Sequence, residues 1–171
     1  ADLINYRILN EKTVEKIEQK SVKTEYGKFN LILYKDLIFD ETHLVLQKGK
    51  ISKNSPTLVR VQQSNFFHDL LNINEFGARW SVSDSMKKIN EAGKGIILLI
   101  DGENKKQDEF NEINSSKKKR ITAPNNDPRR IGIGSQILRD LGVQKIKLMG
   151  SEVRYPSLSG FDLEVTEYLK K

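Results

Sequence analysis

The sequence predicts a mixed α/β fold: one mixed sheet with helices packed on it and an antiparallel portion at its N-terminal side. Strand-type runs dominate residues 29–62, and helix-then-strand patterns replace them from residue 81 onward. The run 95–100 is apolar throughout, which is typical of a strand buried on both faces. With 171 residues, the chain is long enough to bury a sizeable core.

The N-terminal segment is predicted to be helical. Residues 2 to about 20 mix apolar and charged side chains, with few helix breakers before Gly27. This pattern predicts one helix. We expect it to be a connector, with the domain proper covering residues 21–171.

Three β-rich runs come next. They cover residues 29–34, 43–47 and 57–62. The first two flank an acidic, turn-like segment at Asp40 and Glu41, which predicts an antiparallel pair. A loop-rich region over residues 64–80 follows the third run.

The second half alternates helix and strand. Val82, Met86 and Ile89 recur at helical spacing and predict a helix that ends near Gly93, before the buried strand 95–100. The same order then recurs after a polar segment. Its elements are a helix over 133–141, a stop at Gly142, a strand over 145–149 and a last strand within 161–169.

The composition excludes several kinds of site and location. The chain has no cysteine and two histidines, so it has neither disulfides nor thiolate metal sites, and we expect no metal cofactor. No apolar run approaches the roughly 18 residues of a membrane span. The first residues carry charges where a signal peptide would be apolar. We therefore expect a cytoplasmic protein with no membrane partner.

The net charge of +6 favours anionic partners, but much of the excess lies in the cluster 117–120. We interpret this cluster as a solvated loop and do not expect nucleic acid as a partner, although a weak salt-sensitive contact is the alternative. The surrounding segment 105–126 is rich in Asn, Lys, Ser and Glu, and we expect it to be mobile.

Two arginines lie where a helix is expected to begin. Asp127 is a candidate N-cap, and Arg129 and Arg130 would lie beside the free N–H groups of the helix start, which suits an anion. Surface or ion-pair roles are the alternative. The pair Gly132 and Gly134 lacks the third glycine and the preceding strand of a dinucleotide motif, so it is weak evidence for phosphate binding.

Two further candidates contain carboxylates. His68 and Asp69 could form an acid/base pair, but adjacent residues in a strand point to opposite faces and no nucleophile accompanies them. Asp101 and Glu103 follow the buried strand, at the edge where α/β sheets bind ligands. The alternative for this second pair is a turn capped by carboxylates.

The stretches "LVRVQQSNFFHD", "GKGIILLIDGEN" and above all "IGIGSQILRDLGVQKIKLM" resemble GTP cyclohydrolase II, the zinc enzyme that opens riboflavin synthesis. The N-terminal "ADLINYR" and "TEYGKFNLILY" resemble the segment that joins this domain to a 3,4-dihydroxy-2-butanone 4-phosphate synthase in two-domain riboflavin proteins. The resemblance implies a cyclohydrolase-like α/β fold, a preceding synthase domain and a homodimer.

The resemblance also places the zinc ligands of the family, a C-x₁₀-C-x-C set of thiolates. Without gaps these positions fall on Asn65, Phe76 and Ala78, none of which supplies a thiolate. The resemblance therefore implies that the zinc site is lost and that the metal-activated water has no support here.

The nucleotide-binding pieces also depart from the family. Where the family has R-Q-E-G-R, this chain keeps Glu103, ends on Lys105 and replaces the first arginine by Asp101. The family's D-x-R, whose arginine is assigned a phosphate-directed nucleophilic role, survives as vestigial Asp127 and Arg129, but without the aromatic residue two positions on.

Three functions stay open from the sequence. The favoured one is a non-catalytic, structural or regulatory cyclohydrolase-like domain of a riboflavin-pathway synthase. The second is a nucleotide or phosphate sensor that binds through Glu103, Lys105, Arg129 and Arg130. The third is residual GTP cyclohydrolase II activity.

Overall fold

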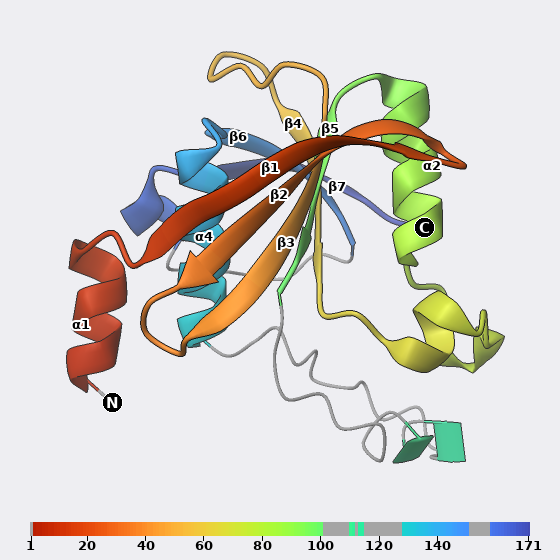
Figure 1. Ribbon diagram of the computed structural model, residues 1–171, viewed down its shortest axis with the longest axis horizontal. Coiled ribbons are helices and arrows are strands. Elements are labelled where there is room, and N and C mark those ends of the chain that lie inside the picture. Colours follow the sequence, from red (N-terminus) through yellow and green to blue (C-terminus); the bar gives the residue numbers. More distant parts are fainter. Residues whose placement is uncertain (1, 101–109, 112, 115–127, 151–157) are drawn as a thin grey trace.

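One mixed sheet of seven strands, in the order β1-β2-β3-β5-β4-β6-β7, forms the centre of the computed structural model (Figure 1). Residues 2–100, 110–111, 113–114, 128–150 and 158–171 are described. The strands are β1 (Val14–Thr24), β2 (Gly27–Asp36), β3 (Glu41–Lys48), β4 (Thr57–Gln62), β5 (Gly95–Leu99), β6 (Lys145–Met149) and β7 (Glu164–Leu169). Pairing is antiparallel from β1 through β5 and parallel from β5 to β7. The predicted mixed α/β class, with its antiparallel N-terminal portion, is confirmed.

Helices cover both faces of this sheet, as Figure 1 shows for α2 and α4. The helices are α1 (Asp2–Asn10), α2 (Val82–Ala92) and α4 (Pro128–Asp140), with short turns at Phe66–Leu70, Asn74–Phe76 and Leu158–Phe161. Successive strand residues point to opposite faces. Leu98 of β5 accordingly packs in the core beneath α4, and its neighbour Ile97 packs in the core beneath α2.

The second helix is placed as its sequence predicts. The Ser81 hydroxyl accepts a hydrogen bond from the Asp84 backbone N–H at 3.0 Å and caps the first turn. Gly93 ends the helix in the left-handed conformation that glycine adopts without strain. The predicted strands at 29–34, 43–47, 57–62 and 145–149 lie within β2, β3, β4 and β6.

The prediction of one helix from residue 2 to about residue 20 is wrong in its second half. The helix α1 ends at Asn10, and β1 begins at Val14. Gln136 of α4 holds this junction: its side-chain N–H donates to the carbonyls of Ile8 (2.6 Å) and Glu11 (3.1 Å). Its oxygen accepts from the backbone N–H of Thr13 at 2.7 Å. These bonds satisfy backbone groups that a continuous helix would have paired internally.

Asp140, at the end of α4, fixes the same junction from a second side. Its carboxylate accepts hydrogen bonds from Lys12 Nζ (2.7 Å) and from the Tyr34 hydroxyl (2.6 Å). Burial and the Asp140 carboxylate raise the pKa of Tyr34 above its ordinary value. Burial alone would raise the pKa of Asp140, but the bonds from Lys12 and Tyr34 outweigh it and lower this pKa.

The two glycines of the G-x-G pair lie inside α4, not in a phosphate-binding loop. A Cβ built on Gly132 would lie 2.4 Å from Ile8 Cγ2, so glycine here lets α1 pack closely on α4. A Cβ on Gly134 would meet Leu98 Cδ2 at an ordinary 3.5 Å. The motif is therefore part of the packing of α1, α4 and the sheet.

Some sequence predictions lie outside the described residues. They concern Asp101, Glu103, Lys105, Asp127 and most of the segment 105–126, with its basic cluster. Among the described residues, no helix has the length and apolar character that spanning a membrane requires.

Candidate functional site

The candidate site lies at the sheet edge where β4 and β5 end. Because β3 runs antiparallel to β5, with Leu44 opposite Leu99, the turn between β2 and β3 lies at this same edge. The first turn of α4 also lies here, since Arg130 Nη1 is 3.9 Å from Glu41 Oε2. Carboxyl ends of parallel strands are where α/β sheets bind ligands.

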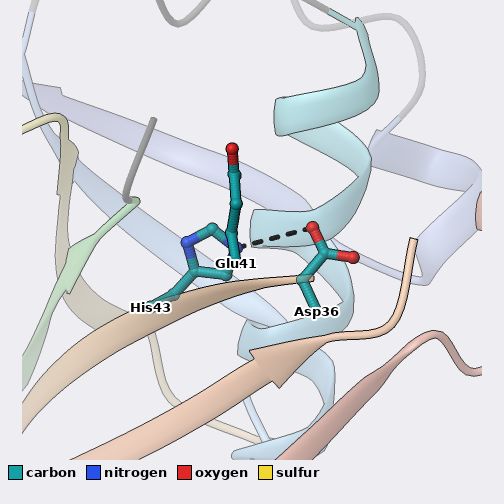
Figure 2. Close-up of side chains that lie close together, drawn as sticks. All are labelled: Asp36, Glu41 and His43. Atoms are coloured by element: carbon teal, nitrogen blue, oxygen red, sulfur yellow. Dashed lines mark ion pairs between the residues drawn. The ribbon is translucent and has the colours of Figure 1, made fainter. Parts of the chain in front are cut away.

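Asp36, Glu41 and His43 form a polar cluster on the α4 face of this edge (Figure 2). Asp36 and Glu41 are direct cross-strand partners, and His43 lies two residues beyond Glu41, so the three side chains share one face. The side chains of Asp36 and His43 are fully buried, and Glu41 is 25% exposed. His43 Nε2 lies 3.6 Å from Asp36 Oδ2, and one ligand atom from each of the three residues lies within 4.8 Å of the others.

The two oxygens of Asp36 have different environments. Oδ1 accepts hydrogen bonds from the backbone N–H groups of Ile38 (2.8 Å) and Phe39 (3.3 Å), which shapes the turn. Oδ2 is buried, faces His43 and accepts no hydrogen bond from a described residue. A buried charged oxygen without a donor is costly unless another positive group compensates it.

The two candidate arginines, Arg129 and Arg130, are both half-buried in the first turn of α4. Arg130 reaches Glu41, which favours the ion-pair alternative for this residue. The grouping of the two arginines with Glu103 and Lys105 stays a prediction, because those two residues lie outside the described part of the chain.

The positions that the resemblance assigns to the family's zinc ligands lie in the loop after β4. Asn65 accepts a hydrogen bond from the His68 backbone N–H at 3.0 Å through its side-chain oxygen, so it caps the turn Phe66–Leu70. Phe76 ends the turn Asn74–Phe76, and Ala78 is exposed. The same loop is held by the Asp69 carboxylate, which accepts from the backbone N–H groups of Asn65 (2.7 Å) and Val82 (3.0 Å).

Asp69 therefore positions this loop, and its hydrogen bonds do not make it the partner of His68. The His68 ring faces a backbone oxygen instead, with Nδ1 3.3 Å from the carbonyl of Ile73. The weaker acid/base interpretation of this pair has no support among these contacts.

Sequence reasoning missed the cluster of Asp36, Glu41 and His43. It placed Glu41 in an acidic turn and His43 in a strand, without combining them. The signal was present: once residues 29–47 are interpreted as a hairpin, Asp36 and Glu41 flank its turn and His43 follows on the same face.

The family model for GTP cyclohydrolase II matches residues 15–170. The chain belongs to the GTP cyclohydrolase II family. Among similar relatives, the 3,4-dihydroxy-2-butanone 4-phosphate synthase of Pseudomonas aeruginosa is 43% identical over 171 residues, covering 99% of this chain and 47% of the relative. The riboflavin biosynthesis protein RibBA of Cytophaga hutchinsonii is 32% identical over 177 residues, covering 97% and 44%.

A solved structure agrees with these relatives. The crystal structure of RibBX, a two-domain 3,4-dihydroxy-2-butanone 4-phosphate synthase from A. baumannii, is 36% identical, has a TM-score of 0.65 and covers 98% of this chain and 43% of that chain. This chain thus spans about half the length of the relatives that it matches. The resemblance to this family, drawn from the sequence motifs, is confirmed.

Proposed function

We propose that this is a GTP cyclohydrolase II-like domain that has no cyclohydrolase activity and serves a 3,4-dihydroxy-2-butanone 4-phosphate synthase as a structural or regulatory part. The observation that carries this proposal is the set of residues at the zinc-ligand positions. A chain without cysteine has Asn65, Phe76 and Ala78 there, and the Asn65 oxygen already caps a turn. These residues do not fit a thiolate-bound zinc ion.

The proposal about the parent protein has separate support. Relatives that carry the synthase name are about twice as long as this chain and match almost all of it. We infer that the chain is one domain of such a protein, with residues near 1–20 leading in from the synthase domain, and that the parent forms a homodimer.

The decisive measurement is formate release from GTP by the purified full-length protein in the presence of Zn²⁺. We expect none above the rate without protein. Stoichiometric formate release would show that the domain is an active cyclohydrolase, and it would contradict the proposal.

A gain-of-site variant tests whether the ligand positions are assigned correctly. Asn65→Cys, Phe76→Cys and Ala78→Cys together restore the thiolate set. The triple variant should take up one more zinc ion per chain than the native protein. The matched control carries serine at the same three positions and should gain none. Equal zinc uptake by both variants would show that the alignment of these positions is wrong.

A second function, nucleotide or phosphate sensing, is favoured by one observation. Arg129 and Arg130 are half-buried at a helix start, beside the carboxyl ends of β4 and β5, where α/β sheets bind ligands. Titration with GTP and with inorganic phosphate tests it. A thermal shift at millimolar ligand that Arg129→Gln abolishes would support this second function, and no shift would remove it.

A further inference from the structure

We propose that Asp36, Glu41 and His43 form a divalent-cation site, separate from the family's zinc-ligand positions, that binds Zn²⁺ most tightly. The three ligands come from one hairpin, β2 and β3, on the face that packs against α4. The family's positions lie elsewhere, in the loop after β4. The cation site therefore does not depend on the thiolates that this chain lacks.

The distance between the buried side chains of His43 and Asp36 supports a shared ion. His43 Nε2 and Asp36 Oδ2 are 3.6 Å apart, which is longer than the donor–acceptor distance of about 2.7–3.2 Å in an N–H···O hydrogen bond. Two ligands of a tetrahedral zinc ion, each about 2.1 Å from it, lie about 3.4 Å apart. The observed distance between Nε2 and Oδ2 is thus close to the distance between two ligand atoms of a zinc site. Glu41, which is partly exposed, completes three ligands by a small movement of its flexible side chain.

The charges of the cluster point the same way. Asp36 and Glu41 face each other directly across two strands, an arrangement that destabilises a sheet when both residues are charged. Arg130 lies near Glu41, at 3.9 Å, and leaves the buried Asp36 oxygen facing the imidazole. A dication between the carboxylates removes their repulsion and gives Asp36 Oδ2 the positive partner that a buried carboxylate needs.

The ligand set determines which ion is expected. One imidazole with two carboxylates is a mixed nitrogen and oxygen set, which suits zinc and manganese better than the all-oxygen preference of magnesium and calcium. Among manganese and zinc, a site of this kind binds zinc more tightly. Affinity should therefore fall from Zn²⁺ to Mn²⁺, with Mg²⁺ and Ca²⁺ weakest.

The test is calorimetric titration of ZnCl₂ into the chelator-treated full-length protein. We expect one ion per chain that His43→Gln abolishes, or weakens by at least about tenfold, since losing even a supporting residue of a metal site costs that much. The control is His68→Gln, which changes the second histidine of the chain and should leave this ion's affinity unchanged. Zinc binding that is lost in His68→Gln, or that keeps its affinity in His43→Gln, would overturn the proposal.

His43 is fully buried, so His43→Gln could lose zinc because it unfolds. Two further measurements do not depend on the folding of that variant. Glu41→Gln alters a partly exposed residue and should still weaken zinc binding. With only two histidines in this domain, ring nitrogen signals in NMR report each one. Zinc should move the Nε2 signal of His43 and leave that of His68 in place. Zinc titration without a change at His43 would show that the cluster is an ordinary buried ion pair.

The outcome is distinguishable from that of the proposed function. Formate release from GTP is measured on the same zinc-loaded sample. Zinc at His43 without formate supports both proposals. Formate release would overturn the proposed function, and unchanged zinc affinity in His43→Gln would overturn the cation site.

Discussion

The two ends of α4 both carry polar contacts to the N-terminal part of the chain, but the contacts differ in kind. At the C-terminal end, the polar atoms of Gln136 and Asp140 all have hydrogen-bond partners in the α1–β1 junction and in β2. At the N-terminal end, Arg130 faces a cluster in which a fully buried oxygen of Asp36 accepts no described hydrogen bond. A satisfied network rigidifies a fold, and an unsatisfied buried atom needs an explanation, for which we propose the cation described above.

The largest effect is expected at the C-terminal end of α4, where the polar atoms have hydrogen-bond partners. Gln136→Leu keeps the volume of the side chain but leaves the buried backbone groups of Ile8 and Thr13 without partners, which should lower the free energy of unfolding by about 3 kcal/mol. Urea unfolding measures this. Gln19→Leu on the exposed strand β1 is the control and should change it by less than about 0.5 kcal/mol. If this domain stabilises the synthase domain of the full-length protein, Gln136→Leu should also lower the temperature at which synthase activity is lost.

The next effect concerns the charge of Asp140. Asp140→Asn weakens the hydrogen bonds from Lys12 and Tyr34, so it should lower the free energy of unfolding by about 1.5 kcal/mol at neutral pH. Because the folded state lowers the pKa of Asp140, its contribution is present above the ordinary carboxyl value of about 3.9 and is lost as the pH falls through the lowered value. The difference between wild type and variant should therefore shrink below about pH 4 in acid unfolding curves.

Two observations would contradict this interpretation of Asp140. One is a difference in stability that does not change down to pH 2. The other is an equal loss in Asp162→Asn, which alters an exposed ion pair with Arg139 and should cost less than about 0.5 kcal/mol.

A smaller effect is expected between the two ends, where α1 crosses α4. Gly132→Ala places a methyl group against the stiff, β-branched Ile8, and this overpacking should outweigh the better helix propensity of alanine by about 1 kcal/mol. Gly134→Ala has room for its methyl group and should be neutral or stabilising by up to about 1 kcal/mol. The midpoint of thermal unfolding should therefore fall in Gly132→Ala and should not fall in Gly134→Ala. A larger loss in Gly134→Ala would contradict the packing role of Gly132.

The smallest effect is expected at the N-terminal end of α4, beside the cluster of Asp36, Glu41 and His43. In chelator-treated protein, Glu41→Gln removes one of two opposed carboxylates and also its contact with Arg130, so the free energy of unfolding should change by less than about 0.5 kcal/mol. With zinc added, wild type should gain more stability than the variant does. A loss of more than about 2 kcal/mol without zinc would mean that Glu41 belongs to a satisfied network after all.

Local sequence pattern predicted much of the fold because most elements bury one regular face. The α2 helix shows this: its apolar residues recur at helical spacing, and Ser81 and Gly93 mark its ends. The strand β1 shows the opposite case. It is exposed along most of its length and has no alternating pattern, and the side chain that ends the preceding helix, Gln136, lies more than 120 residues away in the sequence.

The candidate site was less predictable for a related reason. Asp36, Glu41 and His43 are close in sequence, but only the register of the hairpin places them on one face. The sequence motifs identified the family, and the zinc-ligand positions that they assign to this chain stay a prediction. The anion site predicted at Glu103, Lys105, Arg129 and Arg130 also stays a prediction.

The exposed strand β1 also has a consequence for association between molecules. Among the described strands, it pairs on one side only and so forms an edge of the sheet, and an open edge offers unpaired backbone groups to any other strand. Charged side chains recur along it, at Glu15, Lys16, Glu18, Lys20 and Lys23, and its pairing with β2 is interrupted between Lys16 and Glu18. Closely spaced charges and an irregular register are the features by which natural sheets resist edge-to-edge aggregation, so this edge is protected against amyloid-like growth.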